Sequence, residues 1–270
     1  MINKIPPKKS LGQNFLIDEN IISRIVRSAS LTKDDTVVEI GPGQGALTRE
    51  LTEKAGSVIA IELDERLAAR LSETLSGPAN LQVVSGDALT FPYESLPGKF
   101  KVVANLPYYI STPIITRLLK ARDKISSMIL MLQKEVAARL TASPGGRDYG
   151  YMSVMVQFHA EAGMLFLVPK QAFTPVPKVD SAVVRLDLRD VPEGVSDPVF
   201  FEKVVGASFS KKRKMLKNSL KNSDVIPPDR FDFLMERFFA SGIDPSRRAE
   251  TLSLSEFVLM TKILFENRGL

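Results

Sequence analysis

The stretch that decides the fold is TVVEIGPGQGALTREL, residues 36–51. It begins as a short apolar β-type run, turns at Gly41, Gly43 and Gly45, and continues with a helical pattern of apolar residues. A strand that enters a helix through such a turn is typical of a parallel sheet, whose ligands lie beyond the carboxyl ends of the strands. Glycine lets the backbone approach a ligand without a Cβ in the way. The spacing G-x-G-x-G differs from the G-x-G-x-x-G of dinucleotide-binding enzymes, so the ligand need not be a dinucleotide.

Further β-type runs follow, and most of them are separated by helix-patterned segments. They read SVIAIE, LQVVSGD, KVVAN and SMILMLQ, and a late pair reads GMLFLV and SAVVRLDL. Near-continuous apolar strands that alternate with helices predict a parallel sheet covered on both faces, that is, an α/β fold. From about Asp190 the pattern is helical. We therefore expect an α/β domain with a basic N-terminal arm over residues 1–190 and a small all-α domain over residues 191–270.

Two acidic residues stand where the next two predicted strands end. Glu62 follows Gly41 by about 20 residues, the separation at which an acid at the next strand end accepts hydrogen bonds from ribose hydroxyls. Asp87 closes the third strand, where it could meet an adenine amino group. Glu39, just before the turn, is a common feature of S-adenosylmethionine sites. We therefore expect S-adenosylmethionine as the cofactor. The alternative is that Glu39 is a surface carboxylate at a strand end and that the glycine loop is only a tight turn between strand and helix.

The stretch VVANLPYY, residues 102–109, brings polar and aromatic groups to the end of a fourth strand. The Asn105 side-chain oxygen and a backbone carbonyl freed by Pro107 can both accept hydrogen bonds from one exocyclic amino group. Tyr108 would stack on the ring, and Phe173 in FTPVPKVD is a candidate second platform. A base held between two rings must be flipped out or unpaired. The alternative is that Asn105 caps a turn, the tyrosines pack in the core and Phe173 plugs a turn.

The composition excludes several classes of protein. Hydrophobic residues make up 44% and charged residues 25% of the chain, as in ordinary globular proteins. There is no cysteine and one histidine, His159, which we interpret as structural, so neither disulfides nor a metal site are expected. No apolar run approaches the roughly 20 residues that span a bilayer, and MINKIPPKKS lacks the core of a signal peptide. We expect a cytoplasmic monomer with no membrane partner.

The positive charge is concentrated in one segment. The net charge is +5, and residues 203–221 contain seven basic residues and no acidic one. Such a run, with nothing nearby to neutralise it, predicts a polyanionic partner, and a solvated helix face is the alternative. The expected RNA-binding residues of this run and of two other segments are Lys8, Lys9, Arg147, Lys211, Lys212, Arg213, Lys214 and Lys217.

The chain resembles the KsgA family of ribosomal small-subunit RNA adenine dimethyltransferases over nearly all of its length. The matching stretches include KKSLGQNFLID, VVEIGPGQGALT, VVANLPYYIST, MLQKEVAARLTASPGGRDYGYMSVMVQ, FTPVPKVDSAVV and FSKKRKMLKNSL. The resemblance implies a Rossmann-like, class I methyltransferase sheet of seven strands, mostly parallel, and a small helical domain. It also implies transfer of two methyl groups to N6 of each of two adjacent adenosines in the hairpin loop near the 3′ end of small-subunit (16S) RNA. The implied partner is an immature small (30S) subunit, which family members bind until methylation is done.

The resemblance also assigns roles to residues of this chain. Those expected to hold the target base are Asn105, Leu106, Pro107 and Tyr108, with Phe173 opposite. Those expected to contact the cofactor are Asn14, Leu16, Gly41, Gly43, Glu62, Leu63, Asp87, Ala88 and Asn105. The basic helix of the family usually carries more arginine than FSKKRKMLKNSL does, which favours point-charge over bidentate phosphate contacts there.

Two rival functions remain open from the sequence. One is the related large-subunit RNA adenine methyltransferase that confers macrolide resistance, which shares the glycine turn and the NLPY-type motif. The segment QKEVAARL and the match through PGGRDYGYMSV favour the small-subunit enzyme. The other is a non-catalytic assembly or RNA-binding factor, against which the intact motif of residues 105–108 speaks.

Overall fold

The computed structural model describes residues 5–8, 11–75 and 77–267. By its internal contacts the chain divides into two compact units, one of residues 1–137 and 161–188 and the other of residues 138–160 and 189–270. The expected boundary near residue 190 lies close to the last of these limits. Residues 138–160, which we expected in the first domain, pack instead with the C-terminal helices, because Tyr149, Val154 and Phe158 share a buried cluster with Phe201 and Phe257.

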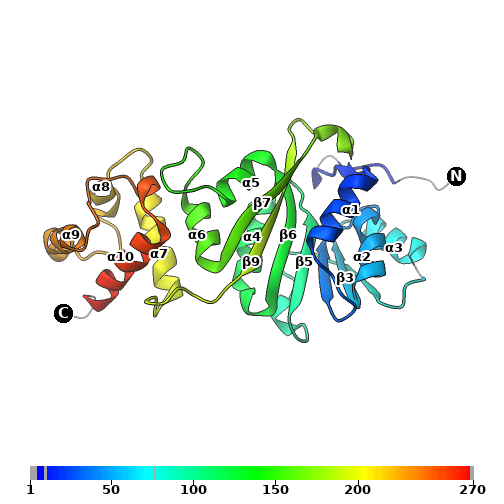
Figure 1. The fold of residues 1–270 in the computed structure, drawn as a ribbon, viewed down its shortest axis with the longest axis horizontal. Helices are drawn as coiled ribbons and strands as arrows, with labels where there is room; N and C mark the ends of the chain where they lie inside the picture. Colours follow the sequence, from blue (N-terminus) through cyan, green and yellow to red (C-terminus); the bar gives the residue numbers. More distant parts are fainter. Residues whose placement is uncertain (1–4, 9–10, 76, 268–270) are drawn as a thin grey trace. The chain divides into compact units, whose positions relative to one another are not determined.

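The first unit is built on a seven-stranded sheet with the order β4-β3-β2-β5-β6-β9-β7 (Figure 1). The strands are β2 (Thr36–Ile40), β3 (Ser57–Glu62), β4 (Leu81–Ser85), β5 (Phe100–Asn105), β6 (Ile125–Gln133), β7 (Ala160–Val168) and β9 (Ser181–Leu188). The five strands from β4 to β6 run parallel, whereas β9 pairs with β6 in the antiparallel direction. The predicted, mostly parallel sheet is confirmed. The reversal brings the first residue of β9, Ser181, opposite Gln133 at the edge where β6 ends.

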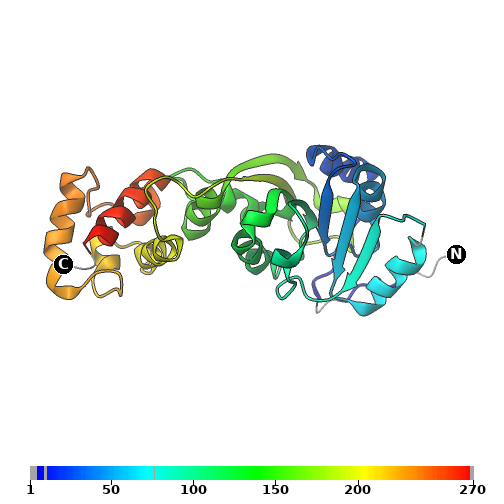
Figure 2. The ribbon, with the colours of Figure 1, turned by 90° about the horizontal axis from the view of Figure 1, so that it is seen from below.

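Helices connect these strands and cover the sheet. They are α1 (Glu19–Ser28), α2 (Ala46–Lys54), α3 (Glu65–Thr74), α4 (Ser111–Lys120) and α5 (Lys134–Leu140), of which the last crosses between the units. Helices α1 and α2 lie on one side of the sheet and α4 on the other (Figure 2). The Asp18 side chain caps α1 by accepting from the backbone N–H groups of Asn20 and Ile21. The capped helix buries Ile25 and Val26 in one cluster with Val103 of β5.

A two-stranded ribbon ties the N-terminal segment to a loop far along the chain. In it β1 (Phe15–Leu16) pairs with β8 (Phe173–Thr174) in the antiparallel direction. The backbone N–H of Ile17 donates to the carbonyl of Ala172 at 2.9 Å and extends this pairing. The ribbon therefore fixes the N-terminal segment within the first unit, and residues 11–16 of this segment line a pocket.

The second unit contains five helices within the described residues. They are α6 (Tyr151–His159), α7 (Pro198–Phe209), α8 (Leu216–Leu220), α9 (Phe231–Ala240) and α10 (Leu254–Glu266). The core of the unit combines aliphatic and aromatic side chains, and the rings of Phe158 and Phe201 stack at 4.0 Å between centroids. The basic stretch 209–220, where the resemblance implies a basic helix, is not one continuous helix. Helix α7 ends at Phe209, residues 210–215 form a turn with Arg213 at φ 63°, and α8 follows.

Two further findings concern membranes and metals. No helix within the described ranges is long and apolar enough to cross a membrane. The same part of the chain brings no three His, Cys, Asp or Glu side chains together as a metal ion would require. His159 packs edge-on against Phe158, with the ring centroids 4.8 Å apart. Its assignment as a structural residue stays a prediction.

Candidate active site

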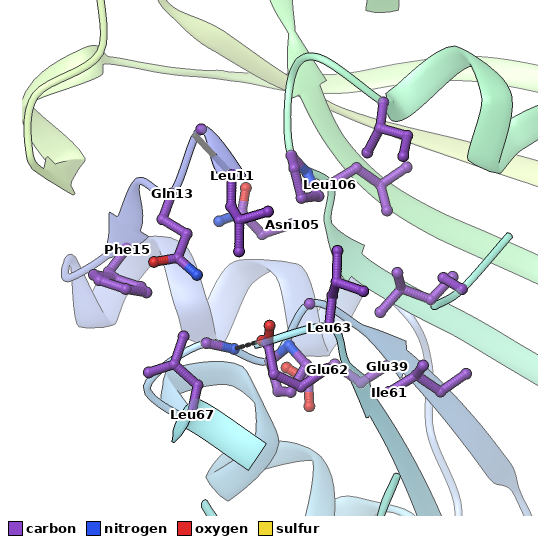
Figure 3. A pocket seen from close by; sticks show the side chains of 18 of the residues that line it. Leu11, Gln13, Phe15, Glu39, Ile61, Glu62, Leu63, Leu67, Asn105 and Leu106 are labelled. Atoms are coloured by element: carbon purple, nitrogen blue, oxygen red, sulfur yellow. Dashed lines mark hydrogen bonds between the residues drawn. The ribbon is translucent and has the colours of Figure 1, made fainter. Parts of the chain in front are cut away.

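One pocket lies where the parallel strands of the first unit end. The loops after β2, β3, β4 and β5 contribute to it, and so does the N-terminal segment 11–16 (Figure 3). The predicted site residues that line it are Asn14, Leu16, Gly41, Gly43, Glu62, Leu63, Asp87, Ala88, Asn105, Leu106, Pro107 and Tyr108. The structure thus brings together every predicted cofactor residue and all of the predicted base-holding residues except Phe173.

The glycine turn has the backbone that only glycine adopts readily. Gly41, Gly43 and Gly45 have φ values of 69°, 59° and 81°, in the left-handed region. A Cβ on Gly43 would also lie 3.1 Å from the Phe15 ring of the N-terminal segment. The backbone N–H of Gly43 donates to Glu62 Oε2 at 2.9 Å. The turn is therefore joined both to the segment that covers it and to the acid at the end of β3.

Glu62 is buried and oriented by two backbone donors. Its Oε2 atom accepts from Gly43, and its Oε1 atom accepts from the N–H of Asp64 at 2.9 Å. Burial raises the pKa of Glu62 in spite of these hydrogen bonds. Each carboxylate oxygen can accept a second hydrogen bond, so the side chain is preorganised to receive hydroxyl donors from the pocket. One Asp87 oxygen, in contrast, accepts from the N–H of Leu89 at 2.9 Å and fixes the turn after β4.

Glu39 is a second buried carboxyl group at the floor of the pocket. It is 1% exposed, and within the described part of the chain its Oε2 atom has no hydrogen-bond partner. Burial raises its pKa to about 8, and the neighbouring charge of Glu62 acts in the same direction. Figure 3 shows Glu39 and Glu62 together, with Leu11 and Gln13 on the other side of the pocket. A buried acid with one unpartnered oxygen in a ligand pocket fits a cationic or hydrogen-bonding ligand group.

Asp64 joins the N-terminal segment to the start of α3. Its wholly buried side chain accepts from Lys8 Nζ at 3.2 Å, from Gln13 Nε2 at 3.3 Å and from the Arg66 guanidinium at 2.7 Å. The Arg66 guanidinium beside it holds the pKa of Asp64 well below its usual range. Lys8, expected on an RNA-binding face, is therefore paired with Asp64. No local pattern singles out Asp64 or Gln13, since the contacts that join Asp64 to Lys8 and Gln13 span more than 50 residues.

The segment 105–108 leaves β5 in a fixed course. The Leu106 N–H donates to the Met131 carbonyl at 3.1 Å, and the Leu106 side chain is buried. The Asn105 Nδ2 group donates to the Asn14 carbonyl at 3.4 Å. No donor among the described residues is bonded to Asn105 Oδ1, so this oxygen can accept from a ligand. Tyr108 is half-buried, and its hydroxyl lies 2.6 Å from Ser181 Oγ.

Phe173 does not occupy the place that we expected. The ring is 1% exposed, it belongs to the cluster that contains Leu16 and Val183, and it does not line the pocket. The pairing of β1 with β8 sets Leu16 opposite Phe173, which covers the ring. A ring so enclosed cannot stack on a base in this conformation. The prediction that Phe173 forms a second stacking platform is therefore wrong for this conformation. Tyr109 is 54% exposed and lines the pocket instead.

The remaining predicted RNA-binding residues lie in the second unit, except for Lys9, which is outside the described residues. Arg147, the turn residues Lys211–Lys214 and Lys217 of α8 are all exposed. Lys211 Nζ donates to the Asn218 carbonyl at 3.0 Å. The turn therefore presents several positive charges to solvent, as a polyanion-binding surface requires.

Comparison with known proteins decides the family. The family model described as "Ribosomal RNA adenine dimethylase" matches residues 6–266. The chain belongs to the ribosomal RNA adenine dimethylase family. Curated relatives named "Ribosomal RNA small subunit methyltransferase A" are similar over most of their length. The protein from Pelotomaculum thermopropionicum is 50% identical over 98% of this chain and 94% of the relative. A relative from Listeria monocytogenes serotype 4a is 47% identical over 95% of this chain and 90% of the relative.

Solved structures of the same class align with the chain. A dimethyladenosine transferase from Plasmodium falciparum has a TM-score of 0.81 at 26% identity and covers 95% of this chain and 98% of its own. The 23S rRNA methyltransferase ErmE has a TM-score of 0.71 at 32% identity. The alignment covers 93% of this chain and 100% of the ErmE chain. These likenesses confirm the predicted family, the class I methyltransferase fold and the enzyme class, an rRNA adenine dimethyltransferase.

Proposed function

We propose that this chain uses S-adenosylmethionine to dimethylate N6 of two adjacent adenosines in the 3′-terminal hairpin loop of small-subunit (16S) rRNA. The observation that carries the proposal is the position of Asn105–Tyr108, which lines the same pocket as the glycine turn and Glu62. An amine-binding motif and a nucleoside-type site thus meet at one sheet edge. Membership of the dimethylase family supports adenine as the target.

The pocket residues fit S-adenosylmethionine. Glu62 offers two oriented oxygens to ribose hydroxyls, and Leu63, which is 47% exposed, offers an apolar surface to adenine. The orphan Oε2 atom of Glu39 suits a hydrogen-bonding or ammonium group. Asn14, Leu16, Gly41, Asp87 and Ala88 would complete the contacts. When bound, the cofactor supplies a methyl group that its sulfonium makes electrophilic.

The protein's own part of the reaction is to hold and orient the adenine amine. The N6 lone pair of adenine is delocalised into the ring, which makes the nitrogen a poor nucleophile. Asn105 Oδ1 and the Leu106 carbonyl would accept its two hydrogens and draw them out of the ring plane, which localises the lone pair. Tyr108 would support the ring by stacking, worth roughly 1–3 kcal/mol. Positioning then supplies most of the rate, and water can take the proton of the methylated amine.

The target must leave its helix before it can enter this pocket. A base presented in an unpaired loop reaches Tyr108 at a cost of a few kcal/mol or less, because little stacking has to be broken. The exposed cations of residues 211–217 would hold the RNA backbone at the same time. We further propose an immature 30S particle as the partner, and the cytoplasm as the place of action of a monomer.

A methylation assay with two substrates tests the proposal. Purified protein and labelled donor are offered immature small-subunit particles and large-subunit RNA in parallel, and the modified adenosines are mapped by mass spectrometry. The account predicts dimethyladenosine at two adjacent positions of the small-subunit RNA. Large-subunit RNA is the competing substrate to test, because ErmE, a 23S rRNA methyltransferase, is 32% identical to this chain and similar in fold. Label in that RNA alone would overturn the choice of substrate.

A further inference from the structure

The Tyr108 ring has a fixed partner outside its own loop. The Tyr108 hydroxyl lies 2.6 Å from Ser181 Oγ, a short hydrogen bond between two side chains 73 positions apart. Ser181 is wholly buried, whereas Tyr108 is half-buried and lines the pocket. The contact thus runs from a rigid strand to the surface of the site.

The antiparallel direction of β9 explains why Ser181 lies beside Tyr108. Because β9 runs against β6, its first residue lies level with Gln133, at the edge where the parallel strands end. The Lys134 N–H also donates to the Asp180 carbonyl at 3.0 Å, which fixes the residue before Ser181. Ser181 is therefore held by backbone contacts that do not involve the pocket.

The loop that carries Tyr108 is fixed by its backbone on both sides of the ring. Leu106 donates to Met131, and the Ser111 hydroxyl donates to the Tyr108 carbonyl at 3.3 Å. These bonds fix the Cα of Tyr108 but leave its side-chain torsions free. The bond to Ser181 restrains the ring itself. It fixes the position of the phenol oxygen, and because the O–H and lone pair of a phenol favour the ring plane, it also restrains rotation of the ring about its long axis.

We propose that Ser181 is a positioning residue for methyl transfer, whose hydroxyl fixes the plane of the Tyr108 ring on which the target base stacks. This inference rests on the proposed function, in which Tyr108 supports the adenine. A ring held in one orientation before the base arrives removes the need to order it during binding. It also sets the plane of the base, and with it the direction of the N6 lone pair. The expected effect is therefore on the rate of transfer more than on donor affinity.

A double-mutant cycle of Ser181→Ala and Tyr108→Phe tests the proposal, because both variants remove the hydrogen bond and keep the aromatic ring. Single-turnover methyl transfer and the KM for donor are measured for wild type, each single variant and the double variant. Each single variant is expected to slow transfer roughly tenfold with an unchanged donor KM, the size of one hydrogen bond. The double variant is expected to be no slower than either single one. Rates that multiply in the double variant, or full activity in Ser181→Ala, would overturn the proposal.

The matched control is Ser127→Ala, which removes another buried serine hydroxyl from the same pair of strands. Ser127 of β6 pairs with Asp187 at the far end of the β6–β9 ladder, and it is 5% exposed. Its alanine variant should transfer methyl groups at the wild-type rate. Because Tyr108→Phe leaves β9 untouched, it tests the bond even if Ser181→Ala folds poorly.

A binding readout separates this proposal from the proposed function. The fluorescence of 2-aminopurine in an unpaired RNA loop falls when the base stacks on an aromatic ring. The quenching at saturating protein should be weaker with Ser181→Ala than with wild type and unchanged with Ser127→Ala. Equal quenching by all three proteins would refute the positioning role, whatever the substrate proves to be. Absence of methylation by wild type, with quenching that depends on Ser181, would refute the proposed function alone.

Discussion

The pocket of the first unit and the basic turn of the second differ in how their polar groups are held. In the pocket, Glu62 and Asn105 are oriented by hydrogen bonds to backbone groups. In the turn, Lys212, Arg213 and Lys214 extend into solvent. Chemistry needs fixed geometry, because a small displacement of a reacting group costs orders of magnitude in rate. Recognition of a phosphate backbone needs mainly charge, which flexible side chains supply.

Replacement of Asn105 by alanine should have the largest effect. The variant loses the side-chain acceptor for the adenine amine, and we expect single-turnover methyl transfer to fall by roughly a hundred- to a thousandfold, as for other preorganised groups at a reacting atom. Binding to small-subunit particles should change little, because the basic turn is intact. The control is Asn20→Ala, which replaces an exposed asparagine of α1. Normal turnover by Asn105→Ala would show that the fixed geometry of the pocket is not needed for methyl transfer.

Titration of Glu39 should come next in size. Burial raises its pKa from 4.5 to about 8, so between these values the folded protein holds a proton that the unfolded chain releases. The ligand-free protein therefore loses stability as the pH rises from 4.5, and the loss ends above pH 8. Between pH 6 and 8 wild type should lose up to about 3 kcal/mol relative to Glu39→Gln, by chemical denaturation. Wild type and Glu39→Gln whose free energies of unfolding change equally with pH would contradict this assignment. The control is Glu53→Gln at an exposed position, which should show the pH dependence of wild type.

Replacement of Glu62 by glutamine should weaken the binding of S-adenosylmethionine. The glutamine side chain keeps one acceptor oxygen but loses the negative charge and the second acceptor oxygen. In wild type the backbone N–H groups of Gly43 and Asp64 orient both oxygens. One charged hydrogen bond is worth about 1.5–3 kcal/mol, so calorimetry should show an affinity roughly ten- to a hundredfold lower. Glu65→Gln, exposed in the first turn of α3, is the control. Equal affinities of the two variants would remove Glu62 from the cofactor site.

The basic turn should show the smallest effect, and one that depends on salt. The double variant Lys211→Ala/Lys212→Ala should bind the particle several-fold more weakly, and the slope of log K against log salt should fall by about 1.5–2. Methyl transfer from the bound complex should be unchanged, because neither residue lines the pocket. Arg237→Ala/Lys262→Ala removes two exposed charges of the same unit as a control. An unchanged slope in the first variant would show that the turn does not touch RNA.

The residues whose convergence could be predicted from the sequence are those that follow from strand order. Gly41, Glu62, Asp87 and Asn105 end neighbouring parallel strands, so their convergence needs only the recognition of those strands. The basic run, in contrast, has the local pattern of a helix, because helical propensity does not show the turn that Arg213 makes at positive φ. The charges of Lys211, Lys212, Arg213, Lys214 and Lys217 are exposed in the observed turn and helix.

Contacts between distant segments account for what the sequence could not show. The burial of Phe173 depends on its pairing with Leu16, and the fixed ring of Tyr108 depends on Ser181. The charge of Lys8 alone predicts an RNA contact, whereas its pairing with Asp64 depends on the tertiary fold. Local pattern carries no information on any of these pairs, since each joins segments more than 50 residues apart.

The most direct test of the central claim is to map dimethyladenosine in ribosomal RNA from cells whose own copy of this gene is deleted. The cells are complemented with either wild type or Asn105→Ala at equal protein levels. The account predicts two adjacent dimethyladenosines near the 3′ end of the small-subunit RNA with wild type, and unmodified adenosines there with the variant. The same modification in both strains, or in the deletion strain itself, would contradict it.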